Sequence, residues 1–444
     1  MAGRRLSSND VSVVIALAIV VLVLLLVFTV ERRGGAVEGQ DASRAARLGA
    51  STGPSAASLS AQPPAVDAGG ASARDACAAM TAELSPGQDG EAVAARQRDE
   101  ALEAILPALG ASAEPRARAA ALYFRAARDR QRSGLAEVCR TRPDECASID
   151  QAHPEDRDSA EALARLAVES ADPQVYAWAH RSCAAAERST ARSCQLINGL
   201  QWARLDPGNA EPWFAVAREA RSRRDGAGVD DAMFHVAAAA VNDAGWGRLA
   251  QAIVQAAPPD DRLLVGTWLA SADALSYELL DLSLPEATRY CDARAVANAN
   301  RRDTCDKIAT VLVDRSTTLI GRSVGVALAK RLDWPAARLA AIEEEGSAAR
   351  AVESRDALPS TEPASCSDVR RDLARRVEMG SVGEVEALRR RMARTGEPIA
   401  ALAEEGRSMA RLADEAEAAR ASATAASAAA MSAETSSSAV AQGR

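Results

Sequence analysis

Residues 201–220, QWARLDPGNAEPWFAVAREA, contain the clearest turn between two helices in the chain. Alanine-rich sequence with helical spacing of apolar residues runs on both sides of this turn. Pro207 cannot continue a helix, and the residue before a proline disfavours helical backbone angles. The stretch therefore predicts that Leu205 closes one helix, that residues 206–208 turn the chain and that Trp213 opens the next helical unit.

The same helical spacing dominates the rest of the sequence. Apolar residues recur at intervals of three and four residues in 262–282 and 304–332, whereas alternating, strand-like patterns are hard to find. Clusters of proline and glycine, such as those at 258–259 and 396–398, divide these segments from one another. The sequence therefore predicts an all-α architecture of stacked antiparallel helical hairpins.

Three tryptophans recur at a nearly constant interval along the chain. Trp178, Trp213 and Trp246 are 35 and 33 residues apart. Asn209 and Asn242 each precede their tryptophan by four residues. A period of this length is typical of helical repeat proteins.

Around these positions the chain resembles the tetratricopeptide family, whose repeat of about 34 residues combines a Trp, a Leu three residues later and a closing Pro. Pro207 stands where the closing proline of the preceding repeat belongs, and Leu249 follows Trp246 at the family's spacing. The match is poor after Trp178, and Ala240 stands where a closing proline is expected before Trp246. The resemblance covers residues 173–275 at most and implies a tetratricopeptide-like solenoid; an irregular α-hairpin protein is the alternative.

Residues 11–30, VSVVIALAIVVLVLLLVFTV, form an apolar run without a charged side chain. A helix of that length spans the hydrocarbon core of a bilayer, roughly 30 Å. A cleaved signal peptide is the alternative, but its apolar region is shorter and ends at a small-residue site. Here Glu31, Arg32 and Arg33 follow directly. We therefore predict one uncleaved transmembrane helix that contacts the lipid bilayer through residues 11–30.

The eight cysteines are spaced as if to form disulfide bonds within helical hairpins. Three pairs lie at similar distances on either side of a predicted turn, where two antiparallel helices bring facing positions within disulfide range. These pairs are Cys139–Cys146, Cys183–Cys194 and Cys291–Cys305, and Cys77 and Cys366 remain as a fourth pair at the two ends of the folded part. Buried free thiols or a metal site are the alternatives, although no C-x2-C spacing occurs and the three histidines are scattered.

The compartment of the large C-terminal part follows from two signals that disagree. Disulfide bonds imply an oxidising compartment, which places this part in the periplasm. Two arginines precede the apolar run and four lie shortly after it, which favours a cytoplasmic location. The cysteine pattern rests on three independent pairs, so we expect a single-pass inner-membrane protein with a periplasmic body.

Composition divides the chain into segments. Alanine, glycine, serine and proline dominate the stretch after the apolar run and also the C-terminus, and such segments carry too little bulky apolar sequence to fold. The expected organisation is a short tail (1–10), the transmembrane helix (11–30), a disordered tether (31–76), a helical-hairpin domain (77–357), a C-terminal helical segment (358–420) and a disordered tail (421–444).

No sequence motif with its structural context points to catalysis. A formal net charge of −8 and a pI near 5.3 argue against nucleic-acid binding, which requires a basic surface. The sequence GRSVG, residues 321–325, has the G-x-S-x-G spacing of a hydrolase nucleophile, but its flanks are helical and all histidines precede Ser323. We expect no enzyme activity, cofactor, metal or small-molecule substrate.

The remaining function is protein–protein interaction. The overall layout also resembles single-pass bacterial envelope proteins, a resemblance that implies no activity. Stacked hairpins present a concave face, and we expect a protein partner to bind there, near Arg181 and Arg218, with Trp213 serving mainly in repeat packing. The alternatives are a membrane adaptor of the same fold that faces the cytoplasm and a hydrolase that uses Ser323.

Overall fold

The computed structural model describes residues 71–84, 88–141, 158–185, 192–279, 283–356 and 363–415, together with residues 418 and 422. Helices account for most of these residues, and the β-structure among them is limited to two isolated β-bridges. The α-helices are α2 (Ala71–Ala82), α3 (Gln88–Gly110), α4 (Pro115–Thr141), α5 (Ser159–Ser170), α6 (Pro173–Ala185), α7 (Gly199–Leu205), α8 (Ala210–Ser222), α9 (Gly226–Ala238), α10 (Arg248–Ala256), α11 (Leu264–Leu279), α12 (Pro285–Tyr290), α13 (Ala299–Arg315), α14 (Leu319–Arg331), α15 (Ala336–Asp356), α16 (Cys366–Val382) and α17 (Glu384–Thr395). Short 3-10 helices are η3 (Ser193–Leu196), η4 (Asp261–Leu263) and η5 (Ala295–Ala297), and residues 399–415 form a further helix. The predicted all-α class is confirmed.

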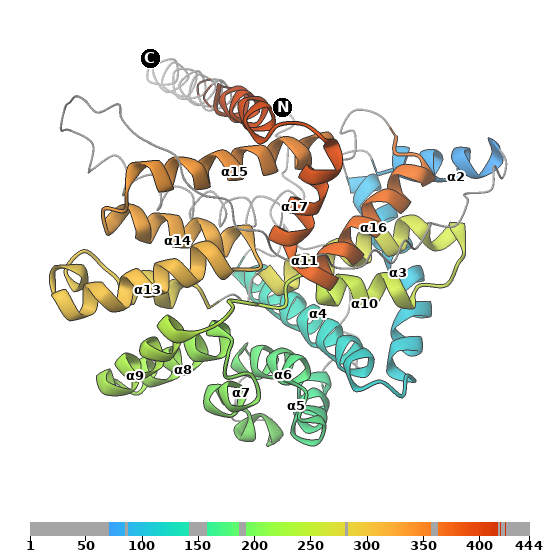
Figure 1. Ribbon diagram of the computed structural model, residues 1–444. Helices are drawn as coiled ribbons and strands as arrows, with labels where there is room; N and C mark the ends of the chain where they lie inside the picture. Colours follow the sequence, from blue (N-terminus) through green and yellow to red (C-terminus); the bar gives the residue numbers. More distant parts are fainter. Residues whose placement is uncertain are drawn as a thin grey trace, which may run out of the picture.

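The helices gather around two main hydrophobic cores (Figure 1). The first core lies among α3 to α7, α10 and α11, and its largest fully buried side chains include Trp178 and Tyr123. The second lies among α8, α9 and α12 to α15, around Phe214, Ile308 and Leu312. The chain passes from one core to the other several times, so sequence neighbours such as α9 and α10 lie in different halves.

Connecting segments from distant parts of the chain pair through their backbones where helices end. The Ala210 N–H donates to the Val241 carbonyl at 2.8 Å, and the Thr317 N–H donates to the Asn242 carbonyl at 3.0 Å. The Val385 N–H in turn donates to the Thr317 carbonyl at 3.1 Å. These bonds align the starts of α8, α14 and α17 beside the extended link between α9 and α10.

We call this series of backbone hydrogen bonds, from Ala210 through Val241, Asn242 and Thr317 to Val385, the backbone ladder. The predicted turn at residues 206–208 lies directly before its first bond. Leu205 ends α7, and the Asn209 side chain caps α8 by accepting a hydrogen bond from the Glu211 N–H. Asn209 also bonds the link after α9, because its amide donates to the Asp243 carbonyl at 2.9 Å. A cap of this kind satisfies one of the free N–H groups at a helix start. The turn therefore holds its own helix and a segment some thirty residues later.

A tetratricopeptide solenoid is not confirmed. In such a solenoid each repeat contacts only its neighbours in sequence. Here α8 and α9, and likewise α13 and α14, do form adjacent pairs, but α3 packs against α11 and α10 packs against α16. In Figure 1, α13, α14 and α15 lie one above another beside α8 and α9, whereas α3, α10 and α16 gather on the opposite side.

The predicted boundaries between segments of the chain agree only in part with the structure. Helix α2 begins at Ala71, inside the stretch expected to be a disordered tether, because that helix packs on α16 and α11. The transmembrane run at 11–30, the rest of the tether and the C-terminal tail apart from residue 422 lie outside the described residues. Within the described residues, no helix is long and apolar enough to cross a membrane.

The contact between α3 and α11 depends on a glycine. A Cβ atom on Gly266 would overlap the carbonyl oxygen of Gln97 and lie 2.9 Å from the Cβ of Ala101. We expect Gly266→Ala to lower the free energy of unfolding by about 1–3 kcal/mol, because overpacking forces the two helices apart. Urea denaturation measures this change.

The matched control for this substitution is Gly346→Ala in α15. A Cβ on Gly346 would meet nothing within 4 Å. This change should raise the free energy of unfolding by about 0.5–1 kcal/mol, since alanine favours a helix over glycine. Equal effects of the two substitutions would contradict the close approach of α3 to α11.

Candidate functional site

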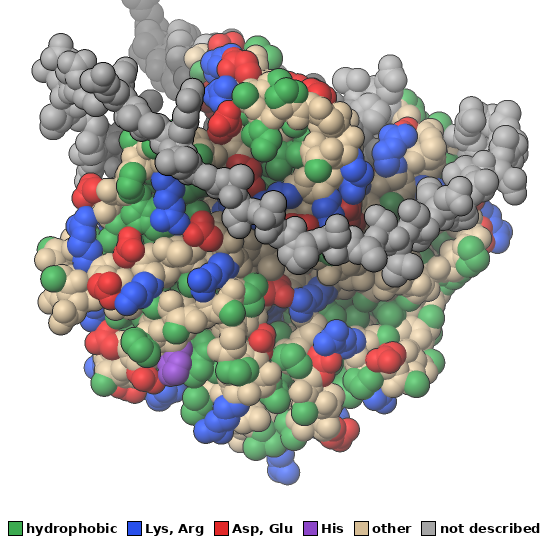
Figure 2. Space-filling model, viewed as in Figure 1, with side chains coloured by type: hydrophobic (Ala, Val, Ile, Leu, Met, Phe, Trp, Pro, Cys, Tyr) green, Lys and Arg blue, Asp and Glu red, His purple; other side chains and the backbone are tan. Residues whose placement is uncertain are grey.

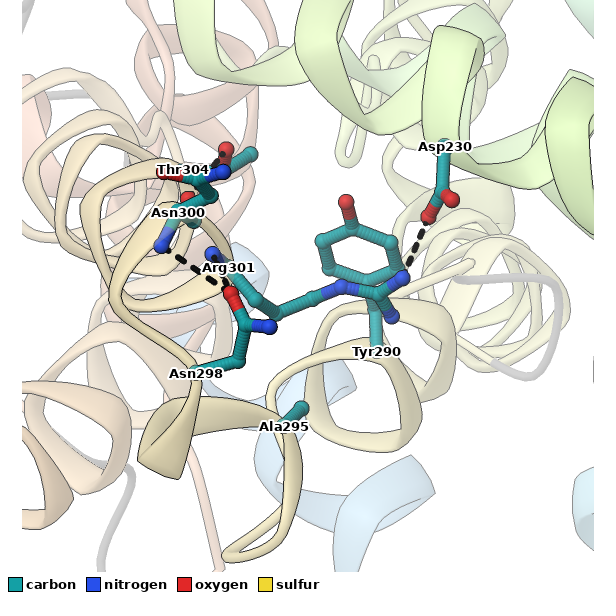
Figure 3. A pocket seen from close by; sticks show the side chains of 7 residues that line it. All are labelled: Asp230, Tyr290, Ala295, Asn298, Asn300, Arg301 and Thr304. Carbon is teal, nitrogen blue, oxygen red and sulfur yellow. Dashed lines mark hydrogen bonds and ion pairs between the residues drawn. The ribbon is translucent and has the colours of Figure 1, made fainter.

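A polar groove between α9, α12 and α13 is the strongest candidate site. Two adjoining cavities, of about 490 Å³ and 300 Å³, share Asp230, Tyr290 and Arg301 in their walls. The first also borders η5 and the start of α13, and the second extends to the turn between α8 and α9. Figure 3 shows the first cavity, with side chains from α9, α12 and α13 converging on it. We call the two cavities together the α9–α13 groove.

A disulfide bond fixes the walls of the groove. Cys291 directly follows Tyr290 and Cys305 directly follows Thr304, and both neighbours line the groove. The two cysteines form a disulfide with a Cα–Cα distance of 5.7 Å, and both are fully buried in the second core. The disulfide therefore ties the end of α12 to the first turns of α13. Asn298 shapes the same corner by capping α13 (Figure 3).

Arg301, Tyr290 and Asp230 form the centre of the groove. The Arg301 guanidinium lies 4.3 Å from the centre of the Tyr290 ring, a cation–π distance, and donates to the Asp230 carboxylate at 2.7 Å. Figure 3 shows this guanidinium reaching along the ring towards Asp230. Burial raises the pKa of the Tyr290 phenol, and Asp230 raises it further, so the phenol stays neutral and can donate a hydrogen bond.

A second set of charges lies at the turn between α8 and α9. Glu286 at the start of α12 is buried and accepts from Arg221 at 2.8 Å and from Arg289 at 2.8 Å. Arg224 lies in the turn between α8 and α9 and also lines the groove. It has a positive φ of 60° and is exposed. This end of the groove thus has three arginines, two of which bond one buried carboxylate.

Sequence reasoning did not identify the groove residues. They come from three segments between residues 221 and 304 whose proximity depends on how α9 packs against α13. One signal was present: the Cys291–Cys305 spacing indicated a constrained corner, and Tyr290 and Thr304 are its immediate neighbours. Charged residues at these positions otherwise have the pattern of ordinary solvated helix faces.

Arg181, expected to face a partner, is instead buried. Only 3% of the residue is exposed, and its guanidinium donates to the Ala244 carbonyl at 2.6 Å. It lies 3.9 Å from the Glu211 carboxylate, and its charge also lowers the pKa of Glu278. Burial is the larger effect and raises the pKa of Glu278 to about 7. The expectation that Arg181 lines a partner groove is therefore wrong: it compensates two buried carboxylates.

The other predicted residues near Arg181 have structural contacts. Arg218 is half-buried on α8, close enough to Glu211 to lower the pKa of that carboxyl, which burial raises. Trp213 lies in the first turn of α8, where its indole N–H donates to the Pro207 carbonyl at 3.2 Å. Its ring stacks on His235 with 3.9 Å between ring centres.

Trp246 has a different place from Trp213, although the two share a sequence pattern. It precedes α10 instead of lying within a helix, and its indole N–H donates to the Leu275 carbonyl at 3.1 Å. Asn242 likewise does not cap the following helix, and its amide donates to Ser316 at 3.1 Å. The repeated pattern therefore marks two steps of the backbone ladder and not two equivalent helix starts.

Three of the four expected cysteine pairs lie at disulfide distance. Cys77–Cys366, Cys183–Cys194 and Cys291–Cys305 have Cα–Cα distances of 5.0, 5.2 and 5.7 Å. The partners do not all belong to long helical hairpins, since Cys194 lies in η3 and Cys291 follows the short helix α12. Cys146 and the side chain of Cys139 lie outside the described residues, so their pairing stays a prediction.

The G-x-S-x-G sequence lies inside α14. The Ser323 hydroxyl donates to the Leu319 carbonyl of its own helix at 2.9 Å. A Cβ on Gly325 would approach the Val313 backbone at 2.8 Å, so this glycine permits close packing on α13. A hydrolase nucleophile needs a strand before it and a histidine within reach. The motif here has neither the strand nor, among described residues, a histidine bonded to Ser323.

Comparison with protein-family models, with curated protein sequences and with solved structures gives no significant match. Within the described ranges, no group of three or more His, Cys, Asp or Glu side chains is placed to hold a metal ion. On the face seen in Figure 2, basic and acidic side chains are interspersed with small hydrophobic clusters. The α9–α13 groove is thus the candidate site on which a functional proposal can rest.

Proposed function

We propose that the chain is a single-pass membrane protein whose helical, repeat-like body binds a protein partner in the bacterial envelope. One observation carries this proposal: the α9–α13 groove is open at the surface, while a buried disulfide between Cys291 and Cys305 fixes its walls. A rigid groove loses little conformational entropy when a partner binds. Residues 11–30 would supply the anchor, and the disulfides support a periplasmic location for the body.

The backbone ladder supports a repeat-like origin of the body. Backbone hydrogen bonds connect the starts of α8 and α14 to the link between α9 and α10, and the start of α17 to the segment before α14; α8–α9 and α13–α14 are adjacent pairs. Repeat bodies of this kind commonly present a surface to a partner and perform no chemistry themselves. A body of the same fold that faces the cytoplasm would have reduced cysteines, which thiol labelling in denaturant after acid quenching of the cells distinguishes.

Photo-crosslinking in intact cells tests the proposal. Asn300 is exposed at the edge of the groove, so a photo-crosslinking amino acid at this position should give a discrete protein adduct. Arg262 is the matched control, because its side chain is 87% exposed and lies outside the groove. Absence of an adduct at position 300, or the same adduct at both positions, would contradict a partner site in the groove.

A further inference from the structure

Positive charge exceeds negative charge around the α9–α13 groove, in contrast to the chain as a whole. The chain has a formal net charge of −8. The charged side chains in or beside the groove are Arg221, Arg224, Arg289, Arg301, Asp225, Asp230 and Glu286. Four cations thus face three anions in a protein that is otherwise acidic.

Each of the three carboxylates already has partners within the protein. Glu286 is 1% exposed and accepts hydrogen bonds from two arginines, Arg221 and Arg289. Asp230 accepts from Arg301 at 2.7 Å, and Asp225 caps α9 by accepting from the Gly228 N–H at 2.9 Å. Two of the three carboxylates are therefore paired with arginines, Asp225 keeps its charge, and the groove residues together retain one excess positive charge.

The arginines retain unused donors. A guanidinium has five N–H donors, and Arg289, with 59% of its side chain exposed, gives one nitrogen to Glu286. Arg224 is exposed and forms no ion pair with any residue in the described part of the chain. Both arginines line the smaller cavity. Carboxylates are a preferred partner for such donors, since arginine binds them through two parallel hydrogen bonds.

We infer that the α9–α13 groove binds an extended acidic segment of a partner protein, with Arg224 and Arg289 receiving its Asp or Glu carboxylates. This inference rests on the proposed function. The two adjoining cavities offer more room than a small inorganic anion fills, and they match the size of pockets that hold several linked groups.

An apolar side chain lies further along α9, beyond Asp230 and away from the arginine-rich end of the groove. Phe234 is 65% exposed and follows Asp230 by one helical turn on α9, so it lies beside the groove. A partner segment that combines acidic residues with an apolar one fits both features. Exposed aromatic and arginine side chains are also the residues that contribute most to binding at protein interfaces.

Fluorescence anisotropy with the full-length protein in detergent tests the inference. The probes are a labelled hexapeptide made of two Glu-Glu-Leu triplets and the same peptide with Gln in place of every Glu. The acidic peptide should bind at least tenfold more tightly than the Gln peptide. Binding should weaken as sodium chloride rises from about 50 to about 500 mM, because salt screens exposed charges.

Arg224→Gln combined with Arg289→Gln should weaken binding of the acidic peptide at least tenfold. Glu286 keeps Arg221 as its partner in this variant, so the unfolding midpoint should remain unchanged. Arg223→Gln is the matched control, because Arg223 is an exposed neighbour in the same turn that does not line the groove. Equal binding by the double variant and the control would overturn the inference.

Other anions give distinguishable outcomes. Inorganic phosphate that displaces the peptide at equal concentration, or vesicles of phosphatidylglycerol that bind in an Arg224-dependent way, would overturn the inference in favour of a small anion or a lipid surface. If the adduct at position 300 persists in cells with the Arg224→Gln, Arg289→Gln variant, the proposal of a partner in the groove stands. The inference that this partner is acidic is then overturned. Loss of the adduct in that variant supports both the partner site in the groove and the acidic nature of the partner.

Discussion

Replacing Cys77 and Cys366 together by alanine should lower the free energy of unfolding by up to about 5 kcal/mol. This disulfide joins α2 to the start of α16 across 289 residues, so its loss frees the largest loop that a described disulfide closes. Both cysteines are buried beside Val265, and alanine keeps this site apolar. Guanidinium denaturation under non-reducing conditions measures the change.

The matched control is the double substitution Cys183→Ala and Cys194→Ala. These cysteines are separated by 11 residues, so the same chain-entropy argument gives a loss of about 3 kcal/mol. Limited proteolysis should also release α2 first in the Cys77→Ala, Cys366→Ala variant, because that helix follows a long N-terminal segment. A loss for the long-range pair no larger than for the local pair would contradict its role in closing the body.

Arg181→Met should lower the free energy of unfolding by about 3–5 kcal/mol at pH 8, and by about 1 kcal/mol or less near pH 5. The substitution keeps much of the side-chain volume but removes the cation beside two buried carboxylates. Glu211 and Glu278 are each at most 1% exposed, and burial raises the pKa of both. Without Arg181, both carboxyls take up a proton more readily in the folded chain.

The direction of the pH dependence follows from Glu278. Its pKa is about 7 in the folded chain and near 4.5 without the fold. Between these values the folded chain holds a proton that the unfolded chain has released, so stability from this group falls as the pH rises. Arg181→Met raises the folded-state pKa of Glu278 further and so extends this pH range upwards. The loss of stability between pH 5 and pH 8 is therefore larger in the variant.

Chemical denaturation at pH 5 and pH 8 checks this prediction with two further variants. Adding Glu278→Gln to Arg181→Met should recover part of the loss at pH 8, because one buried charge is removed along with its cation. Arg218→Met, at a half-buried arginine on α8, should change stability by less than about 1 kcal/mol. A loss for Arg181→Met that is the same at both pH values would contradict the buried carboxylate pair.

Local signals in the sequence predicted the helices, the turn and two of the cysteine pairs, Cys183–Cys194 and Cys291–Cys305. Asp206-Pro207-Gly208 marks its turn because proline ends a helix, and Asn209 caps the next one. The spacing of Cys291 and Cys305 around a turn was enough to predict their pairing, since few residues separate them. These features depend on neighbours in the chain, which a sequence displays directly.

Packing between distant helices could not be predicted in the same way. Many apolar helix faces here are rich in alanine, and such faces carry little shape that would select one partner over another. The contact of α3 with α11 depends on the absence of a side chain at Gly266, which the sequence shows without showing its neighbour. The tetratricopeptide resemblance implied contacts only between neighbours, and these long-range contacts lie outside that pattern.

Arg181 and the α9–α13 groove show the same limit for polar residues. Arg181 has the sequence context of a solvated helix face, and its burial depends on Glu211 and Glu278 from two other helices. The groove likewise requires Asp230 and Arg301, 71 residues apart, to meet. Such residues are recognised only when the packing of their helices is known.

The most direct test of the account is the state of the cysteines in intact cells. Intact cells are quenched with acid, thiols are blocked with maleimide in denaturant so that buried thiols also react, and peptides are then mapped by mass spectrometry without reduction. The account predicts linked peptides for Cys77–Cys366, Cys183–Cys194 and Cys291–Cys305, with no maleimide on these six residues. Maleimide on Cys291 and Cys305 would contradict both the disulfide that fixes the walls of the α9–α13 groove and the periplasmic location of the body.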